Sequence, residues 1–108
     1  MAGAVIPLVL ESAEHLPDGM GGHLTTWRAL GLLYGQMTAT GRQAGPETVP
    51  GTALRWRITM RAHPPGDPRR PRPGQRLRMG GRVFRIETVA EAGPHGRHLD
   101  VMAQEEQQ

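Results

Sequence analysis

The sequence predicts an all-β protein, a small β-barrel or sandwich of five to six short antiparallel strands with two long loops. Several segments alternate apolar and polar residues, which is the pattern of a strand with one buried face. The 108 residues include 15 glycines and 10 prolines, too many for long helices and typical of short strands joined by frequent turns. A chain of this length supports one core and not two, so we expect a single domain over residues 1–108.

The first strand is expected from Ala4 to Glu11. It contains Pro7, and proline cannot donate to a strand ladder, so this strand should lie at an edge or carry a bulge. A turn with the sequence PDGMGG follows at residues 17–22. From His23 to Thr38 the chain is rich in Thr, Leu and aromatic residues, and two internal glycines favour bent strands, with a helix as the alternative.

Two long loops are expected on either side of one clear strand. Residues 39–53 contain two prolines and three glycines, which predicts a long loop and permits a short helical turn around Arg42. Residues 54–63, LRWRITMRAH, alternate strictly, with Leu54, Trp56, Ile58, Met60 and Ala62 on one face. The proline-rich residues 63–76 cannot pair as a central strand and should form a stiff, extended loop.

The C-terminal third, residues 78–106, reads as a β-meander. Gly80 and Gly81 can supply the positive φ angles of a tight hairpin turn, two apolar-polar alternations follow, and residues 104–108 form a polar tail that we expect to be frayed. The expected core anchors are Trp27, Trp56, Ile58, Met60, Phe84, Ile86, Leu99 and Val101, and Tyr34 is a further large side chain that should pin the packing.

All 13 basic residues are arginines, and the formal net charge is only +3 because ten acids offset them. One segment nevertheless gathers five arginines without an acid: Arg69, Arg70, Arg72, Arg76 and Arg78. It could face phosphate groups, or it could be a solvated loop or a result of arginine-rich codon usage.

A second group, Arg55, Arg57 and Arg61, shares the polar face of the 54–63 strand and requires nearby carboxylates or phosphates. Either Glu11, Glu87 or Glu91 of the same chain neutralises these arginines, or a neighbouring subunit, an acidic partner or a nucleic acid does.

The sequence offers little chemistry for an enzyme, and we expect no catalytic residues, no metal and no cofactor. The five histidines lack the i, i+4 spacing that favours metal ligation on a helix, and the chain has no cysteine. Its one serine, Ser12, stands in no nucleophile motif, and no phosphate-binding or dinucleotide motif occurs. The apolar run at the N-terminus is too short to cross a bilayer, so we expect no secretory signal, no membrane contact and a cytoplasmic location.

The order of these features resembles that of a known family. The features are an N-terminal strand, the PDGMGG turn followed by Thr26-Trp27, a strand ending near Thr38, Gly41-Arg42-Gln43, RITMR at 57–61, GGRVFRI at 80–86, Val89-Ala90, and a last strand with Leu99-Asp100-Val101 before Glu105-Glu106. This layout resembles the head–tail joining proteins of tailed phages, which include the head-closure or stopper proteins of phages and of phage-derived gene transfer agents.

The resemblance implies a β-barrel that assembles as a homo-oligomeric ring in the neck of a particle built in the host bacterial cytoplasm. Its partners would be the portal and adaptor rings above, a tail terminator or tail protein below, and packaged double-stranded DNA in the channel. The segment arginines and Arg42 would then face the channel, the DNA or a partner, and Arg55, Arg57 and Arg61 a neighbouring subunit or an acidic partner. The alternatives are a tail terminator or other neck or tail component, and a small nucleic-acid-binding barrel.

Overall fold

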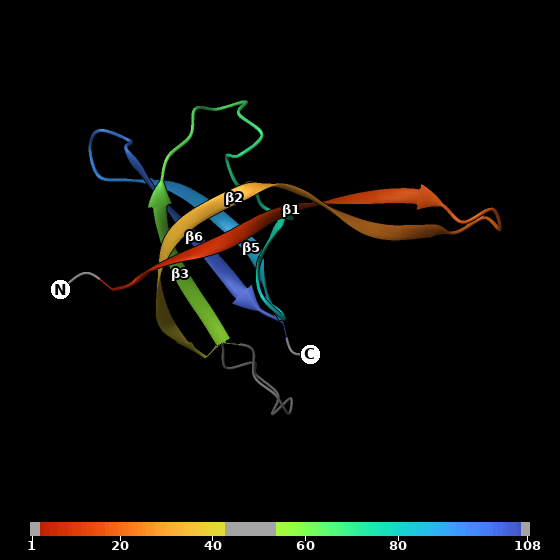
Figure 1. Cartoon of the computed structure of the whole chain (residues 1–108), viewed down its shortest axis with the longest axis horizontal. Helices are drawn as coiled ribbons and strands as arrows, with labels where there is room; N and C mark the ends of the chain where they lie inside the picture. Colours follow the sequence, from red (N-terminus) through yellow and green to blue (C-terminus); the bar gives the residue numbers. More distant parts are fainter. Residues whose placement is uncertain (1–2, 43–53, 107–108) are drawn as a thin grey trace.

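The computed structural model describes residues 3–42 and 54–106, which form six antiparallel strands and, over these residues, no helix (Figure 1). The strands are β1 (Val5–Pro17), β2 (His23–Arg42), β3 (Leu54–Arg61), β4 (Arg76–Met79), β5 (Arg82–Ala92) and β6 (His98–Glu105). They close into a barrel in the order β1-β2-β3-β6-β5-β4. The predicted all-β class is confirmed, and of the two predicted shapes the chain adopts the barrel.

β1 and β2 form one hairpin, in which β1 continues past its predicted end at Glu11 to Pro17 and β2 past Thr38 to Arg42. The turn between them has Gly19 and Gly21 at positive φ, and the Asp18 carboxylate accepts bonds from the backbone N–H of Met20 and of Gly22 at 2.7 and 3.0 Å. The helical alternative for 23–38 is wrong. Of the two alternatives for Pro7, the edge is confirmed, because β1 pairs there with β2 alone. The register between the strands shifts at Leu10/Glu11, where Leu30 of β2 has no partner, so the bulged strand is β2.

The outer part of this hairpin projects from the barrel. β4 pairs with β1 only over Val9–Glu11, so beyond Glu11 the two strands pair only with each other. We call this two-stranded projection, residues 12–28, the arm. Figure 1 shows the arm extending away from the barrel along the longest axis of the molecule, whose principal extents are 51 × 38 × 24 Å.

The C-terminal meander is present, with two differences from the prediction. The turn between β4 and β5 has a positive φ at Gly80 alone, as a type II′ turn requires, and not at Gly81. The tail predicted for 104–108 is wrong for its first residues, because β6 continues to Glu105 and Gln104 pairs with Arg55 and Arg85. Residues 107–108 lie outside the described part.

Both predicted loops change their limits or their form. Residues 39–42 belong to β2, so Arg42 ends a strand and the expected helical turn is wrong at that position; the rest of that loop, 43–53, lies outside the described residues. The second loop spans 62–75 and is not extended, because hydrogen bonds close turns at Pro64–Asp67, Asp67–Arg70 and Arg72–Gln75. We call residues 62–75 the proline loop.

The core fills the barrel interior and contains most of the predicted anchors. Ile58, Met60, Phe84, Ile86, Leu99 and Val101 are buried there with Leu8, Leu10, Leu33, Leu77 and Ala103, and Trp56 packs against them half-buried. Trp56 and Phe84 meet edge to face, with ring centroids 6.2 Å apart. Two predicted anchors are not core residues: Trp27 lies on the arm, and Tyr34 is 57% exposed on the outer face of β2.

Candidate interaction surfaces

A buried carboxylate fixes the arm to the barrel. Glu11 lies where the β1–β2 register shifts and is 5% exposed. Its two oxygens accept bonds from Arg76 Nε at 2.7 Å and Arg78 Nε at 3.0 Å. Burial, the largest single influence, opposes ionisation of Glu11, but the bonds and charges of the two arginines together outweigh it and hold the pKa below its usual value.

Arg76 also contacts the arm. The Arg76 guanidinium lies 4.1 Å from the centroid of the Trp27 ring, a distance at which a cation is attracted to the face of an indole. Trp27 is therefore half-buried beneath an arginine of β4 and helps to orient the arm. The sequence places Glu11 and Arg76 65 residues apart, so only the β1–β4 register brings this cluster together.

The proline loop is held by its own polar contacts. Arg69 and Asp67 form an exposed ion pair at 3.2 Å, and the hydrogen bond from Arg69 lowers the pKa of Asp67. Arg70 donates to the His63 carbonyl at 2.8 Å and lies 3.7 Å from Glu91 of β5. Pro71 is fully buried, which fixes the middle of the loop to the body of the protein.

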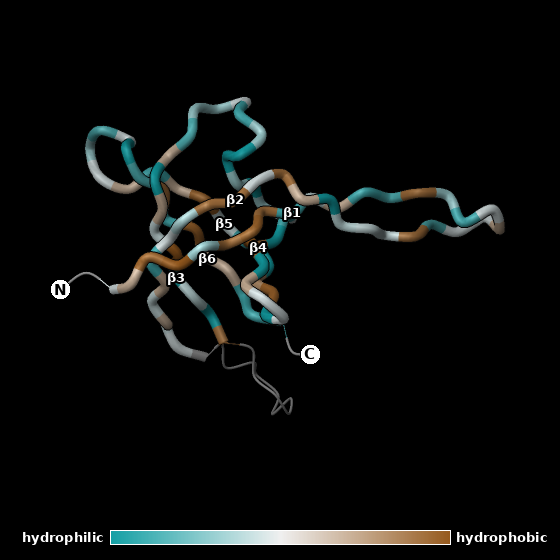
Figure 2. The backbone as a smooth tube through the Cα atoms, viewed as in Figure 1, coloured by the Kyte–Doolittle hydropathy of each residue, from teal (hydrophilic) through white to brown (hydrophobic). Residues whose placement is uncertain are grey.

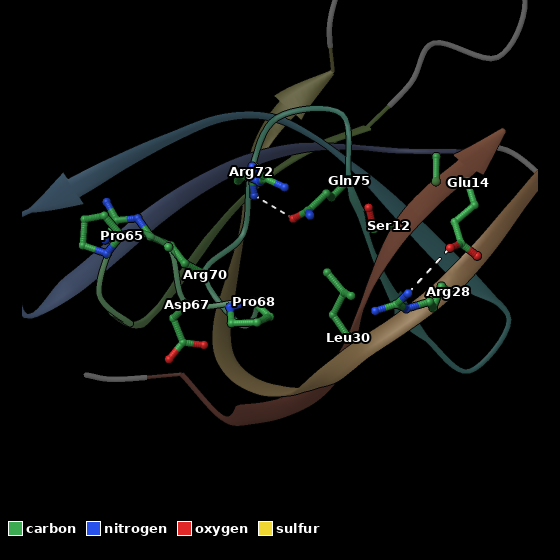
Figure 3. A pocket seen from close by; sticks show the side chains of 12 residues that line it. Ser12, Glu14, Arg28, Leu30, Pro65, Asp67, Pro68, Arg70, Arg72 and Gln75 are labelled. Carbon is green, nitrogen blue, oxygen red and sulfur yellow. Dashed lines mark hydrogen bonds and ion pairs between the residues drawn. The ribbon is translucent and has the colours of Figure 1, made fainter.

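A cleft of about 580 Å³ separates the proline loop from the base of the arm (Figure 3). Ser12, Glu14, Arg28 and Leu30 line it from the arm side, and Pro65, Asp67, Pro68, Arg70, Arg72 and Gln75 from the loop side. Glu14 and Arg28 form an exposed ion pair at 3.6 Å across the arm. The walls thus carry charges of both signs, which suits a polar protein surface better than a phosphate chain.

The five arginines predicted as one patch are distributed over three settings. Arg76 and Arg78 lie on β4 and bind Glu11, while Arg69 and Arg70 lie in the proline loop beside Asp67 and Glu91. Arg72 is exposed in the cleft, and its backbone N–H donates to the Gln75 side chain at 2.8 Å. Arg42 is the last residue of β2, far along the strand from these groups.

The arginines on the outer face of β3 also differ from one another. Arg55 pairs with Glu87 at 3.0 Å, which is one of the three acids considered for this role. Arg57 and Arg61 are exposed, and neither forms an ion pair with another of the described residues. Between them, the Thr59 hydroxyl donates to Asp100 of β6 at 2.8 Å.

Sequence reasoning missed a polar cluster at the C-terminal end of β6. Glu105 accepts two bonds from Arg82, at 2.8 and 2.9 Å, and one from the Trp56 ring N–H at 2.9 Å. The Arg82 hydrogen bonds are the main cause of a lowered pKa at Glu105. The cluster was missed because residues 104–108 were expected to be frayed, although the two glutamates at 105 and 106 already indicated negative charge there.

Sequence reasoning also missed the exposed apolar side chains. The large hydrophobic residues exposed in the described ranges are Val5, Leu16, Met20, Leu24, Leu32 and Tyr34, and all six lie on β1, β2 or the turn that joins them. Figure 2 shows hydrophobic stretches along the otherwise polar arm. A surface of this kind is typical of protein contacts.

The described residues contain no group of three or more His, Asp or Glu side chains placed to hold a metal ion. They also contain no helix long and apolar enough to cross a membrane. What the structure offers is a set of surfaces, namely the arm, the cleft and the outer face of β3.

Comparisons with known proteins match almost the whole chain. The model of the family described as phage head completion protein matches residues 7–106. Among solved structures, the chain is similar to a chain in the virion of a native gene transfer agent particle, with 41% sequence identity and a TM-score of 0.76. That similarity covers 96% of this chain and 94% of the other. The comparison with curated proteins found no match.

Proposed function

The chain belongs to the phage head completion protein family, and on this premise we propose that it is a structural component of a particle neck. There it closes the filled head, as a ring beneath the portal and adaptor, and presents the surface to which the tail attaches. The observation that carries the proposal is the 41% identity, over nearly the full chain, to a protein in an assembled gene transfer agent particle.

The shape of the molecule supports a connecting role. A compact barrel gives a rigid body, and the arm gives a projection along the longest axis that can reach a neighbouring molecule. The internal ion pairs at Glu11 fix where the arm leaves the barrel. A fixed projection loses less conformational entropy on binding than a flexible one, and this favours assembly from preformed parts.

The exposed surfaces suit protein partners in the neck. Apolar side chains on the arm can be buried at an interface, and Arg57 and Arg61 can pair with acids of a neighbouring subunit or of an adjoining ring. Of the five arginines in the 69–78 segment, we assign the channel-facing role to Arg72 alone, because Arg69, Arg70, Arg76 and Arg78 lie beside carboxylates of the same chain.

Deletion of the gene tests the proposal. Cells that produce the particle should then release DNA-filled heads that leak and carry no tails, and a plasmid copy of the gene should restore tailed particles. Electron microscopy and nuclease protection of the packaged DNA provide the two readouts. Intact tailed particles from the deletion strain would refute the proposal.

One observation favours the nucleic-acid-binding alternative, namely the exposed Arg57, Arg61 and Arg72, which form no ion pair among the described residues. Each phosphate neutralised should steepen the salt dependence of binding by about 0.9 log unit per log unit of salt. Filter binding of purified protein to duplex DNA across a salt series measures this slope. Absence of binding at low salt would dismiss the alternative.

A tail terminator or another neck component would share the same small β-rich fold. Immunogold labelling of the particles separates these roles, because a head-closure protein should remain on tailless heads and a tail terminator on free tails.

A further inference from the structure

The exposed apolar residues of the β1–β2 hairpin form two groups at its opposite ends. Leu16, Met20 and Leu24 lie at the tip of the arm, and Met20 is 84% exposed. Val5, Leu32 and Tyr34 lie on the outer face of the barrel, each more than half exposed. Both apolar surfaces face water in the single chain. A contact between two copies would bury them.

The tip has features of a segment that another molecule covers. Leu16 and Leu24 are direct partners across the two strands and share one face of the arm with Glu14. A two-stranded ribbon without a third strand is only marginally stable in water. A partner that covers the apolar face would therefore stabilise the arm itself as well as the complex.

The barrel offers a groove for such a tip. It has a volume of about 460 Å³, opens beside the start of β1, and is lined by Val5, Tyr34, Met60 and Arg61, among others. Tyr34 gives the groove an exposed aromatic wall, and Met60 at its base belongs to the core. An unbranched methionine such as Met20 fills irregular apolar spaces of this kind well.

Charge complements this apolar match. Arg61 lines the groove and has no ion-pair partner among residues 3–42 and 54–106. On the arm, Glu14 is half exposed, and its contact with Arg28 is long, at 3.6 Å. Glu14 thus places a negative charge beside the apolar surface of the arm, and Arg61 places a positive charge beside that of the groove.

The arm cannot reach the groove of its own chain. Figure 1 shows the tip of the arm and the start of β1 at opposite ends of the longest axis, which spans 51 Å. We propose that the arm tip of one copy docks in the groove of the next copy, with Met20 and Leu16 against Tyr34 and Val5, and Glu14 toward Arg61. A contact between two different surfaces is heterologous, and such a contact generates a ring when its rotation closes.

This inference rests on the proposed function, because the assembled neck brings the copies together. The chain contains no cysteine, so engineered thiols would be its only ones. Particles should be produced with the double variant Met20→Cys/Tyr34→Cys and treated with a short bis-maleimide, which tolerates a few ångströms of misplacement. We expect a ladder of dimers, trimers and larger products, because each copy offers one tip and one groove.

Three controls define the result. The single variants Met20→Cys and Tyr34→Cys should give no ladder, and Met20→Cys/Thr88→Cys should give none because Thr88 is exposed on β5 and does not line the groove. Adding Arg61→Glu to the tip–groove pair should abolish the ladder, and adding Glu14→Arg as well should restore it.

The outcomes separate the two proposals. If the chain is present in particles and its tip links to Thr88 as well as to Tyr34, to another protein instead, or to nothing, the arm–groove contact is wrong while the proposed function stands. If complete particles form without the chain, the proposed function fails and the contact with it.

Discussion

At the residue scale, Glu11 connects the two parts of the molecule. It is almost fully buried at the point where the arm leaves the barrel, and it is ionised because two arginines of β4 bind it. Removing one member of such a group leaves buried charge without compensation, which costs more than the intact group contributes. Glu11 therefore has a larger effect on stability than the exposed ion pairs of the same strand.

Glu11→Gln should lower the free energy of unfolding by about 2–3 kcal/mol, because a neutral amide cannot neutralise the charges of two guanidinium groups. Urea unfolding followed by tryptophan fluorescence measures this. Glu14→Gln, on the same strand but in an exposed pair, is the matched control and should change stability by less than about 1 kcal/mol. Equal effects of the two substitutions would contradict the assigned role of Glu11.

The pKa values of Glu11 and Glu105 are both lowered in the folded protein. The folded state therefore binds fewer protons than the unfolded chain once the pH falls toward 4.5, the ordinary value of a glutamate. The stability that these groups contribute should be complete above that pH and be lost as the pH falls through the lowered folded values. Urea midpoints between pH 7 and pH 3 measure the loss, and Glu11→Gln should make the decline shallower; an unchanged slope in this variant would count against the pairing.

At the scale of elements, the β1–β2 hairpin combines two environments in the same pair of strands. Its inner part packs on the barrel core, where Gly35 of β2 comes so close to β3 that an added Cβ would lie 2.7 Å from Ile58 Cγ2. Its outer part is the arm, which has one partner strand and no core beneath it. The two parts should therefore respond differently to mutation and to local opening.

Gly35→Ala should destabilise the barrel by about 1–3 kcal/mol, because fully buried Ile58 has little room to move. Gly81→Ala is the control, since its added methyl would meet nothing within 4 Å and its φ is ordinary. Thermal unfolding of both variants provides the comparison. A Gly35→Ala protein as stable as the control would show that β2 and β3 are less closely packed.

In the free protein, the arm amides at 12–16 and 23–28 should exchange with deuterium faster than those of β3 and β6, which are paired on both sides. In assembled particles the arm should become protected. Hydrogen–deuterium exchange with mass spectrometry reads out both states. Protection of the arm in the free protein equal to that of β3 would argue that it needs no partner.

Strands could be predicted where one face is buried, because burial of one face makes apolar and polar residues alternate along the sequence. β3 has one face on the core, so its alternation is regular and the predicted start at Leu54 is confirmed, although the strand ends at Arg61 and not at His63. The outer arm has no buried face and therefore no such period, which is why β1 was expected to end at Glu11 and not at Pro17. Trp27 was placed in the core for its size, whereas Arg76, distant in the sequence, covers it.

At the scale of the whole molecule, the strand register decides which residues meet on each surface. No short sequence motif reveals that register. The contacts of Glu11 with Arg76 and of Glu105 with Trp56 join residues 65 and 49 positions apart. Of the five arginines that form one segment in the sequence, four pair with Glu11, Asp67 or Glu91, and Arg72 alone forms no ion pair with another described residue. The family, by contrast, could be inferred from the order of strands and turns, and the match over residues 7–106 confirms it.

The central claim is that the barrel is a building block of a particle neck. Cryo-electron microscopy of assembled particles tests it most directly. The account predicts a ring of this chain between the portal assembly and the tail, with each arm against a neighbouring copy. A complete neck whose density leaves no place for this chain would contradict it.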